Sequence, residues 1–280
     1  MGNLRTINKI VTGTRATDGA GVNLVRVIGY DDVREFDPFL MLDAFDSENP
    51  DDYTKGFPWH PHRGIETLTY LISGDIEHMD SLGNKGSILN GDCQWMTAGS
   101  GIIHKEMPKA SLRMLGFQLW LNLPAKNKMC DPKYRDINHS IIPIIKEDTT
   151  IIRVIGGEYK DTAGATKGDY VKPNILDVEI KGEGEWFLDT DEESTLFIYI
   201  VNGSGYFSEN EDKIISEKHA ILFNKGKILK VKAGNEGIRF IVFTGRALKE
   251  PIAWGGPIVM NTQEELRQSF LELDRDEFIK

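Results

Sequence analysis

Cysteine is scarce in this chain, with two residues in 280. Two thiols cannot build the dense disulfide framework of a small secreted domain, so Cys93 and Cys130 are predicted to be reduced side chains that pack in the interior. Long apolar runs are also missing. No segment approaches the roughly 20 residues that span a bilayer, and residues 1–8 lack the apolar core of a signal peptide. These absences predict a soluble, cytoplasmic protein without a membrane segment.

Several functional motifs are absent as well. The chain has no glycine-rich phosphate loop, no GxSxG elbow and no CxxC pair, which argues against a nucleotide-binding enzyme or a serine hydrolase. Basic residues are in deficit, because 33 Lys and Arg face 43 Asp and Glu, and both halves are more acidic than basic. Direct binding of nucleic acid through phosphate contacts is therefore not expected.

What the sequence does contain is two short patterns of metal-binding side chains, His60-Pro61-His62 and His104-Lys105-Glu106. Residues i and i+2 of a strand project to the same face, so each pattern directs two ligating groups to one side of a sheet. Three nitrogens and one oxygen suit iron, copper, nickel or zinc better than calcium or magnesium, which prefer oxygen ligands. The patterns predict a mononuclear transition-metal site.

Glycine-rich turns bound the two patterns. Asn90-Gly91 is a dipeptide favoured in tight hairpins, and Gly99 and Gly101 let the chain bend just before His104. Both patterns are therefore expected on short strands.

The neighbours of the first pattern have ordinary interpretations. Pro61 cannot give an N–H to a sheet, so we expect its histidines at the entrance of a strand or on its less paired side. Trp59 is predicted to be a core aromatic. Arg63 is predicted to be a surface charge, with steering of a substrate towards the metal as the alternative. His78 is expected to be solvated or hydrogen-bonded.

Longer strings make the chain similar to the pirin family of the cupin superfamily. The first cupin motif falls on His60, His62, Glu66 and Gly74, and the second on Gly91, Gly99 and His104. Four residues separate Gly99 from His104 where most cupins have two, but pirins share this spacing. The pirin-like strings cover most of the chain: FDPFLMLDAFD (36–46), WHPHRGIET (59–67), GDCQWMTAGSGIIHKEMP (91–108), LWLNLPAKNKMCDPKY (119–134) and GPIVMNTQEEL (256–266).

The resemblance implies a ligand set and an activity. By position, the metal ligands are His60, His62, His104 and Glu106. Glu66, which many cupins use as a ligand, is expected behind the histidines, where it orients a histidine or the substrate, with direct ligation as the alternative. Pirin resemblance implies quercetin 2,3-dioxygenase activity, in which a flavonol binds the metal, O₂ cleaves its central ring, and Glu106 or Glu66 accepts the proton.

The metal and the partners follow from the same resemblance. The predicted cofactor is one divalent transition metal, iron first, with copper, nickel, zinc or manganese as alternatives that identical ligands also accept. The predicted partners are a small aromatic substrate and O₂. The competing hypothesis is a non-enzymatic iron-binding regulatory protein that acts through protein partners. Native metal, physiological substrate and oligomeric state stay open, although two fused barrels favour a monomer.

Length and strand signals predict an all-β bicupin, with two jelly-roll β-barrel domains in tandem and a short C-terminal helix. Residues 1–135 are expected to form the metal-binding domain. Residues 136–280 are expected to form a second cupin that has lost its metal, because His219 is the only histidine after residue 140.

Individual elements can also be placed from the sequence. A strand is predicted over 115–123, a turn at 202–205 and a polar connector over 124–151. Leu229 and Val231 should face away from Lys230 and Lys232. A capping box of Thr262 and Glu265 predicts a helix that packs on a barrel.

Overall fold

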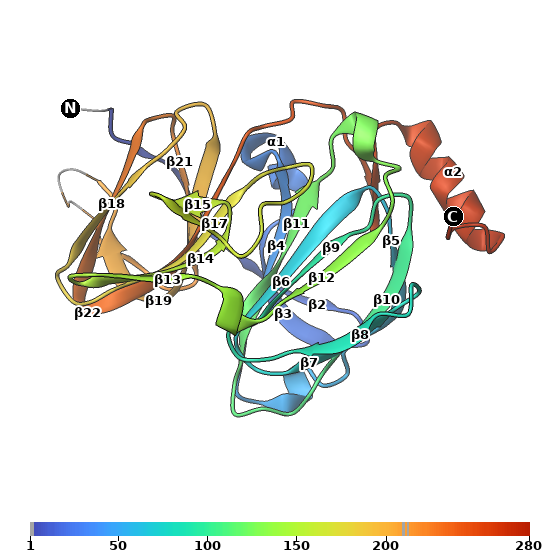
Figure 1. Ribbon diagram of the computed structural model, residues 1–280, viewed down its shortest axis with the longest axis horizontal. Coiled ribbons are helices and arrows are strands. Elements are labelled where there is room, and N and C mark those ends of the chain that lie inside the picture. Colours follow the sequence, from blue (N-terminus) through green and yellow to red (C-terminus); the bar gives the residue numbers. More distant parts are fainter. Residues whose placement is uncertain (1–2, 209–210, 212) are drawn as a thin grey trace. The chain divides into compact units, whose positions relative to one another are not determined.

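The computed structural model describes residues 3–208, 211 and 213–280, which fold into two compact units (Figure 1). The histidine unit comprises 14–33, 39–139 and 248–280, and the second unit comprises 1–13, 34–38 and 140–247. These units differ from the contiguous halves 1–135 and 136–280 that the sequence predicts. The first strand of the chain pairs within the second unit, and residues 248–280 pack within the histidine unit. Each end of the chain therefore belongs to the unit formed mainly by the other half of the sequence.

The histidine unit contains two antiparallel sheets. The larger has seven strands in the order β12-β9-β6-β11-β4-β3-β2: β2 (Thr14–Asp18), β3 (Val22–Ile28), β4 (Phe39–Ser47), β6 (Ile65–Ser73), β9 (Cys93–Thr97), β11 (Met114–Asn122) and β12 (Lys133–Ile137). The smaller has four in the order β5-β10-β7-β8: β5 (Phe57–His62), β7 (Ile76–Asp80), β8 (Lys85–Ile88) and β10 (Ile102–Pro108). A buried apolar cluster draws on both sheets: Val22, Leu24, Phe45, Tyr53, Leu71, Ile76, Ile88 and Met114.

Strand β11 shows how the large sheet presents two different faces. The predicted apolar face is present, since Phe117, Leu119 and Leu121 are fully buried. The intervening residues Gln118 and Trp120 project from the opposite face and line a cavity. Trp120 is only 7% exposed and Gln118 is partly buried, so both faces of β11 are largely buried, and a single alternation of apolar and polar residues does not describe the strand.

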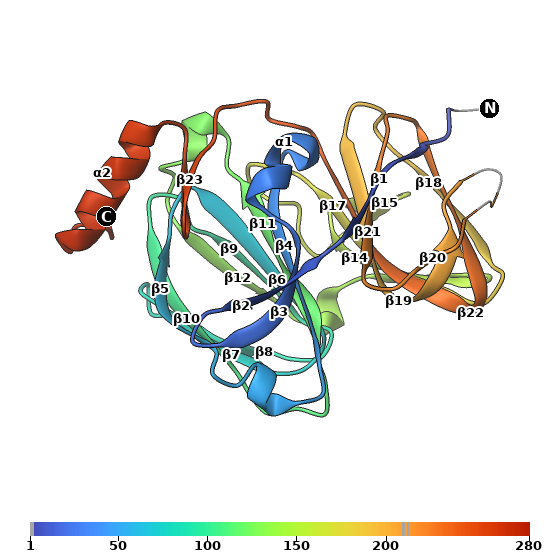
Figure 2. The ribbon, with the colours of Figure 1, turned by 180° about the vertical axis from the view of Figure 1, so that it is seen from behind.

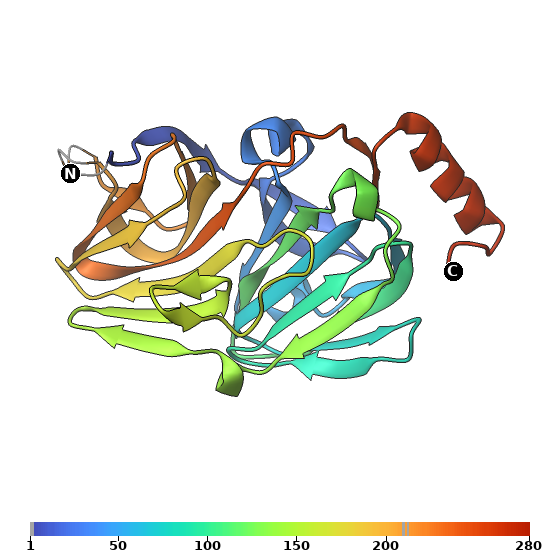
Figure 3. The same ribbon diagram turned by 45° about the horizontal axis from the view of Figure 1, so that its top comes forward.

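The C-terminal segment adds a small hairpin and a helix to the histidine unit. Strands β23 (Ala253–Gly255) and β24 (Ile258–Met260) pair with each other, and helix α2 (Gln263–Asp274), red in Figure 3, follows. Thr262 accepts a hydrogen bond from the N–H of Glu265 at 3.1 Å, and the Glu265 carboxylate returns to the Thr262 N–H, which confirms the capping box. The helix packs on this hairpin through Leu266.

The second unit is built on one large antiparallel sheet (Figure 2). Its main path is β1-β21-β19-β22-β17-β14-β13, and β18 and β20 pair with β22 and β19. The bounds are β1 (Ile7–Thr12), β13 (Ile144–Glu147), β14 (Thr150–Gly156), β17 (Asn174–Ile180), β18 (Glu185–Asp189), β19 (Thr195–Tyr206), β20 (Ile215–Ser216), β21 (His219–Phe223) and β22 (Ile228–Gly245). The predicted alternation is confirmed, because Leu229 and Val231 are buried while Lys230 and Lys232 are partly exposed.

The remaining elements are short. Strands β15 (Glu158–Tyr159) and β16 (Thr162–Ala163) form a separate hairpin. The short helical turns are η1 (Tyr30–Asp32), α1 (Val33–Phe36), η2 (Pro50–Asp52), η3 (Ala125–Asn127) and η4 (His139–Ile141). Within the described part of the chain, no helix has the length and apolar character needed to cross a membrane.

Three local predictions need correction. The predicted turn at 202–205 lies inside β19. The strand accommodates these residues through shifts in its register with β22 and through the positive φ of Gly203. The predicted connector over 124–151 contains β12 and β13, because its polar residues pair with β9 and β14. Neither cysteine forms a disulfide with a described residue, but only Cys93 is buried, and Cys130 is partly exposed.

Candidate metal centre

The pairing of β5 with β10 brings the two histidine patterns together. His60 lies directly opposite His104, and His62 lies opposite Ile102, in antiparallel register. Their ring centroids are 4.3 Å apart for His60 and His104, and 5.1 Å apart for His62 and His104. One nitrogen from each ring lies within 4.8 Å of the others. Among the residues the structure describes, this is the only group of three such side chains that could hold a metal ion.

Strand β5 is the edge strand of its sheet, which explains how Pro61 fits between two histidines. One side of β5 pairs with β10, and the missing N–H of Pro61 removes no bond from the interior of the sheet. The structure thus places Pro61 and its flanking histidines on a strand that pairs on one side within its sheet.

Burial keeps two of the rings neutral. His62 and His104 are 2% and 1% exposed. Burial and the neighbouring His60 lower the pKa of His62 to about 3, and burial also lowers the pKa of His104 well below its ordinary value. Neutral imidazole is the form that binds a metal.

The nitrogens of these rings support a bound cation. Nε2 of His62 and both ring nitrogens of His104 are buried without a hydrogen-bond partner among the described residues. Buried polar atoms without partners destabilise a fold, and native structures contain few of them. A transition metal accepts such lone pairs, so the donor set fits the cofactor that the sequence predicts.

Backbone carbonyls orient two of the rings. Nδ1 of His60 lies 2.8 Å from the Pro58 carbonyl, and Nδ1 of His62 lies 3.1 Å from the Pro257 carbonyl. A carbonyl can only accept, so Nδ1 carries the hydrogen in both rings and Nε2 is left as the free donor to a metal.

Glu106 lies beside the histidine cluster. Its Oε2 is 3.9 Å from Nε2 of His104, and the carboxylate is 3% exposed. Nε2 of Gln118 donates to both carboxylate oxygens, at 3.1 and 3.0 Å, and the Thr69 hydroxyl lies 3.4 Å away. The carboxylate is not one of the groups that lie within 4.8 Å of one another, and its role as a fourth ligand stays a prediction.

Glu66 does not lie where the sequence interpretation placed it. It is paired in register with Leu121 and Thr97, and the Thr97 hydroxyl donates to its Oε1 at 2.7 Å. The cavity-facing residues of this pairing are Gln118 and Trp120, so Glu66 projects from the opposite face of the sheet. Counting in twos from His62 gave the wrong face because β5 ends at His62 and β6 begins only at Ile65.

Two other side chains differ from expectation, and one agrees with it. Trp59 is 51% exposed and lies at the rim of the cavity rather than in the core. Arg63 is 1% exposed and belongs neither to the surface nor to the cavity wall. His78 is hydrogen-bonded through Nδ1 to the Tyr134 hydroxyl, as predicted.

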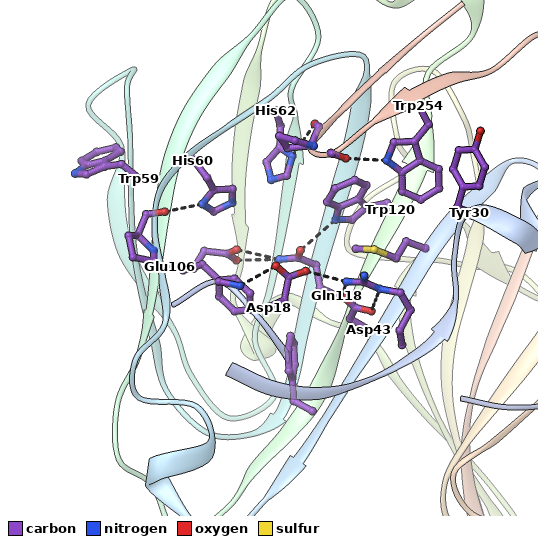
Figure 4. A pocket seen from close by; sticks show the side chains of 18 residues that line it. Asp18, Tyr30, Asp43, Trp59, His60, His62, Glu106, Gln118, Trp120 and Trp254 are labelled. Carbon is purple, nitrogen blue, oxygen red and sulfur yellow. Dashed lines mark hydrogen bonds and ion pairs between the residues drawn. The ribbon is translucent and has the colours of Figure 1, made fainter. Parts of the chain in front are cut away.

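A cavity of about 620 Å³ opens onto the histidines (Figure 4). Trp120, Trp254 and Tyr30 form an aromatic wall, with ring centroids 5.8 Å apart for the two tryptophans. Arg26 and Asp43 add a charged group to the lining, joined by two hydrogen bonds of 2.9 and 2.8 Å.

Most of this cavity lining was not predicted. Trp120 and Asp43 lie within quoted family strings but carry no motif, and Gln118, Asp18 and Arg26 lie outside those strings. Gly256 and Pro257 begin another quoted string, which was the one available signal that the C-terminal segment contributes to the site.

The chain is similar to known proteins along most of its length. A family model described as pirin matches residues 21–121, and one described as the pirin C-terminal cupin domain matches residues 175–279. A Pseudomonas aeruginosa protein named "putative quercetin 2,3-dioxygenase" is 42% identical over 96% of both chains. Human pirin is 34% identical over 97% of this chain and 93% of its own. The crystal structure of a quercetin 2,3-dioxygenase from Acinetobacter baumannii is 31% identical, covers 98% of both chains and has a TM-score of 0.88.

The buried His62 gives a pH-dependent stability that can be measured in metal-free protein. Its folded pKa of about 3 lies below the ordinary 6.5, so its contribution is full above about pH 6.5 and is lost as the pH falls towards 3. Between about pH 7.5 and about pH 5, we expect His62 alone to lower the free energy of unfolding by about 2 kcal/mol. Urea unfolding of wild type and His62→Asn measures this difference.

The matched control is His219→Asn, which changes a histidine of the second unit. It should keep the wild-type pH dependence. An identical pH dependence in wild type and His62→Asn would contradict the prediction.

Proposed function

Because the chain belongs to the pirin family, we propose that it is a mononuclear metal-dependent dioxygenase that cleaves flavonols such as quercetin with O₂. One observation carries the proposal: three buried or half-buried imidazoles converge at the wall of a cavity of about 620 Å³, and two of them, His62 and His104, have buried ring nitrogens without a hydrogen-bond partner among the described residues. Catalytic metal sites combine few protein ligands with access for substrate, and this arrangement has both features.

Three histidines and a carboxylate would hold the metal. Nε2 of His60 and His62 and a ring nitrogen of His104 supply the nitrogen ligands, and Glu106 is the proposed oxygen ligand. The proposed metal is iron, with copper, nickel, zinc or manganese as ions that the same ligands accept. A bound ion of this kind would act as a Lewis acid towards substrate oxygens and would support chemistry with O₂.

Glu106 is also the proposed proton acceptor. Its carboxylate lines the cavity, so a hydroxyl of a bound substrate can reach it. Gln118 donates to both carboxylate oxygens and receives a bond from the Trp120 N–H at 3.1 Å. Through this chain of bonds, the aromatic wall and the proton acceptor keep a fixed relation to each other. Glu66 is given no catalytic part, because it faces away from the cavity.

The cavity suits a flat, hydroxylated ligand. Its volume falls within the roughly 300–1,000 Å³ of small-molecule sites, and aromatic walls favour stacking of a planar ring. The charged part of the wall has two carboxylates for one guanidinium, because Arg26 binds both Asp43 and Asp18. Surplus carboxylate oxygen accepts hydrogen bonds from neutral hydroxyl groups and repels anions. The proposed substrates are therefore polyhydroxylated aromatic compounds.

Two substitutions in the site test the reaction. His62→Ala removes a ligand and should lower both metal content and oxygen uptake on quercetin to near background. Glu106→Gln keeps the shape of the side chain but cannot accept a proton, so turnover should fall by at least about 100-fold. Oxygen consumption, the ring-cleaved product of quercetin and the bound metal are measured on the same protein preparations.

His219→Ala serves as the control and should turn over quercetin at the wild-type rate. Undiminished turnover in both site variants with metal still bound would overturn the proposal. Wild-type protein that holds one metal per chain and turns over no flavonol would overturn it as well, and would favour the non-enzymatic alternative.

Substrate hydroxyls test the charged wall. Asp18→Asn removes the surplus negative charge but keeps the size of the side chain. In wild type, kcat/KM should be higher for flavonols that carry one or two hydroxyls on the pendant ring than for the flavonol that carries none. The variant should reduce this ratio of kcat/KM values by about 10-fold, which corresponds to the loss of one hydrogen bond to a charged group. Steady-state kinetics on the three compounds measures this.

Asp31→Asn is the matched control, since Asp31 is exposed and does not line the cavity. It should leave the preference unchanged. Equal preference in wild type and Asp18→Asn would remove Asp18 from substrate recognition while leaving the proposed reaction in place.

A further inference from the structure

We propose that the C-terminal segment, residues 253–278, is a positioning element of the metal centre: it fixes the ring of His62 through the Pro257 carbonyl and is fastened by the buried Arg63. The proposal rests on the metal site proposed above. It assigns a role to a helix and tail that lie far from the histidines in the sequence, and to an arginine whose burial the site itself does not explain.

The segment lies directly against the backbone that carries His62. The N–H of Val259 donates to the Arg63 carbonyl at 3.1 Å, and Ile258 forms a parallel bridge with Arg63. Gly64 makes this approach possible. It has a φ of +76°, and a Cβ at this position would lie 1.9 Å from the Val259 carbonyl oxygen. Only glycine fits where the two segments meet.

The two orienting carbonyls come from different parts of the chain. His60 is oriented by Pro58, two residues away, so its acceptor is part of the same strand. His62 is oriented by Pro257, 195 residues away. Without the segment, Nδ1 of His62 would lose this acceptor, and nothing local would hold the hydrogen on Nδ1 or direct Nε2 to the other rings. The geometry of His62 therefore depends on where the C-terminal segment docks.

Arg63 fastens the segment. Its guanidinium donates from Nε to the Ser100 carbonyl at 2.7 Å, from one terminal nitrogen to Glu272 of α2 at 2.8 Å, and from the other to the Phe278 carbonyl at 2.8 Å. It also lies 4.1 Å from the centroid of the Phe278 ring. A buried charge is tolerated when it is hydrogen-bonded, and each nitrogen of this guanidinium has a partner, two of them in the C-terminal segment and one at Ser100.

A second buried basic side chain strengthens the same junction. Nζ of Lys128 lies 2.8 and 2.9 Å from the carbonyl oxygens of Gly64 and Val259 and is also hydrogen-bonded to the side chain of Asn122. Burial lowers the pKa of Lys128 to about 7, and the three acceptors match the three N–H groups of its protonated form. The turn after His62 is thus joined to the C-terminal segment by two side chains, those of Arg63 and Lys128.

The segment also contributes to the cavity. Trp254, Gly256 and Pro257 line it, and the Trp254 N–H donates to the Gly256 carbonyl at 2.8 Å. One docking event therefore sets both the tautomer of a metal ligand and part of the substrate wall. A purely structural helix would affect stability, whereas a positioning element also affects the His62 ring and the affinity for metal.

Full-length variants of the fastening residues test this. Arg63→Gln, Glu272→Gln and Phe278→Ala are compared by two readouts: the nitrogen NMR signals of the His62 ring in metal-free protein, and the dissociation constant for Co²⁺ in competition with a chelator. We expect wild type to show a single Nδ1–H tautomer. Arg63→Gln should mix the tautomers and weaken Co²⁺ binding by about 10- to 100-fold, the usual cost of losing a partner that orients a ligand.

The controls separate position from stability. Glu264→Gln changes an exposed residue of the same helix whose carboxylate is paired with Arg267, and this variant should leave both readouts at wild-type values. Arg63→Lys keeps the charge but not the three-way geometry, and its Co²⁺ affinity should lie between those of wild type and Arg63→Gln. If Arg63→Gln fails to fold, Glu272→Gln and Phe278→Ala carry the test.

The outcomes also separate this proposal from the proposed function. Folded variants that keep the single tautomer and wild-type Co²⁺ affinity overturn the positioning role. Variants that lose the tautomer support it even if wild type cleaves no flavonol, because the tautomer is measured without metal or substrate. A wild type that cleaves flavonols while Arg63→Gln, Glu272→Gln and Phe278→Ala behave as wild type overturns this proposal alone.

Discussion

The metal centre depends on one constraint, the antiparallel register of β5 and β10. With His60 opposite His104, the i and i+2 spacing of each pattern places all three imidazoles on one face of a two-strand ribbon. A slip by a single residue would move one pattern to the other face and separate the rings. The irregularity between His104 and Glu106 matters for the same reason, because Glu106 pairs with Phe57 rather than continuing the regular register. This register shift lies next to Glu106, whose carboxylate accepts a hydrogen bond from Gln118.

The sequence was sufficient wherever the determining contacts are local or periodic. Two short patterns located the histidines, a capping box located the start of α2, and alternation located the faces of β22. Each of these rests on residues within a few positions of one another. The two-unit cupin fold followed from strand signals together with strings similar to a known family.

The sequence failed wherever a face or a partner is set by distant parts of the chain. Glu66 was assigned to the wrong face because the break at Arg63 and Gly64 resets the alternation between β5 and β6. Arg63 was read as a surface charge because its partners, Glu272 and Phe278, are more than two hundred positions away. The compact units differ from the contiguous halves for the same reason. The alternation of apolar and polar residues indicates which face of a strand can be buried, but it does not indicate which other part of the chain packs against that face.

The interiors of the two units differ in the polar groups that they contain. In the second unit, a large buried cluster is apolar and includes Ile152, Val178, Trp186, Leu229 and Phe240. In the histidine unit, apolar clusters are accompanied by buried imidazoles and a carboxylate, and these groups need partners to be stable when buried. Such an interior cannot be stabilised by burial alone, because each unpartnered polar atom costs free energy. It needs hydrogen bonds from segments that are distant in the sequence. The buried side chains of Arg63 and Lys128 provide them, because they bind the carbonyls of Phe278 and Val259 and so join the region of the metal ligands to the C-terminal segment.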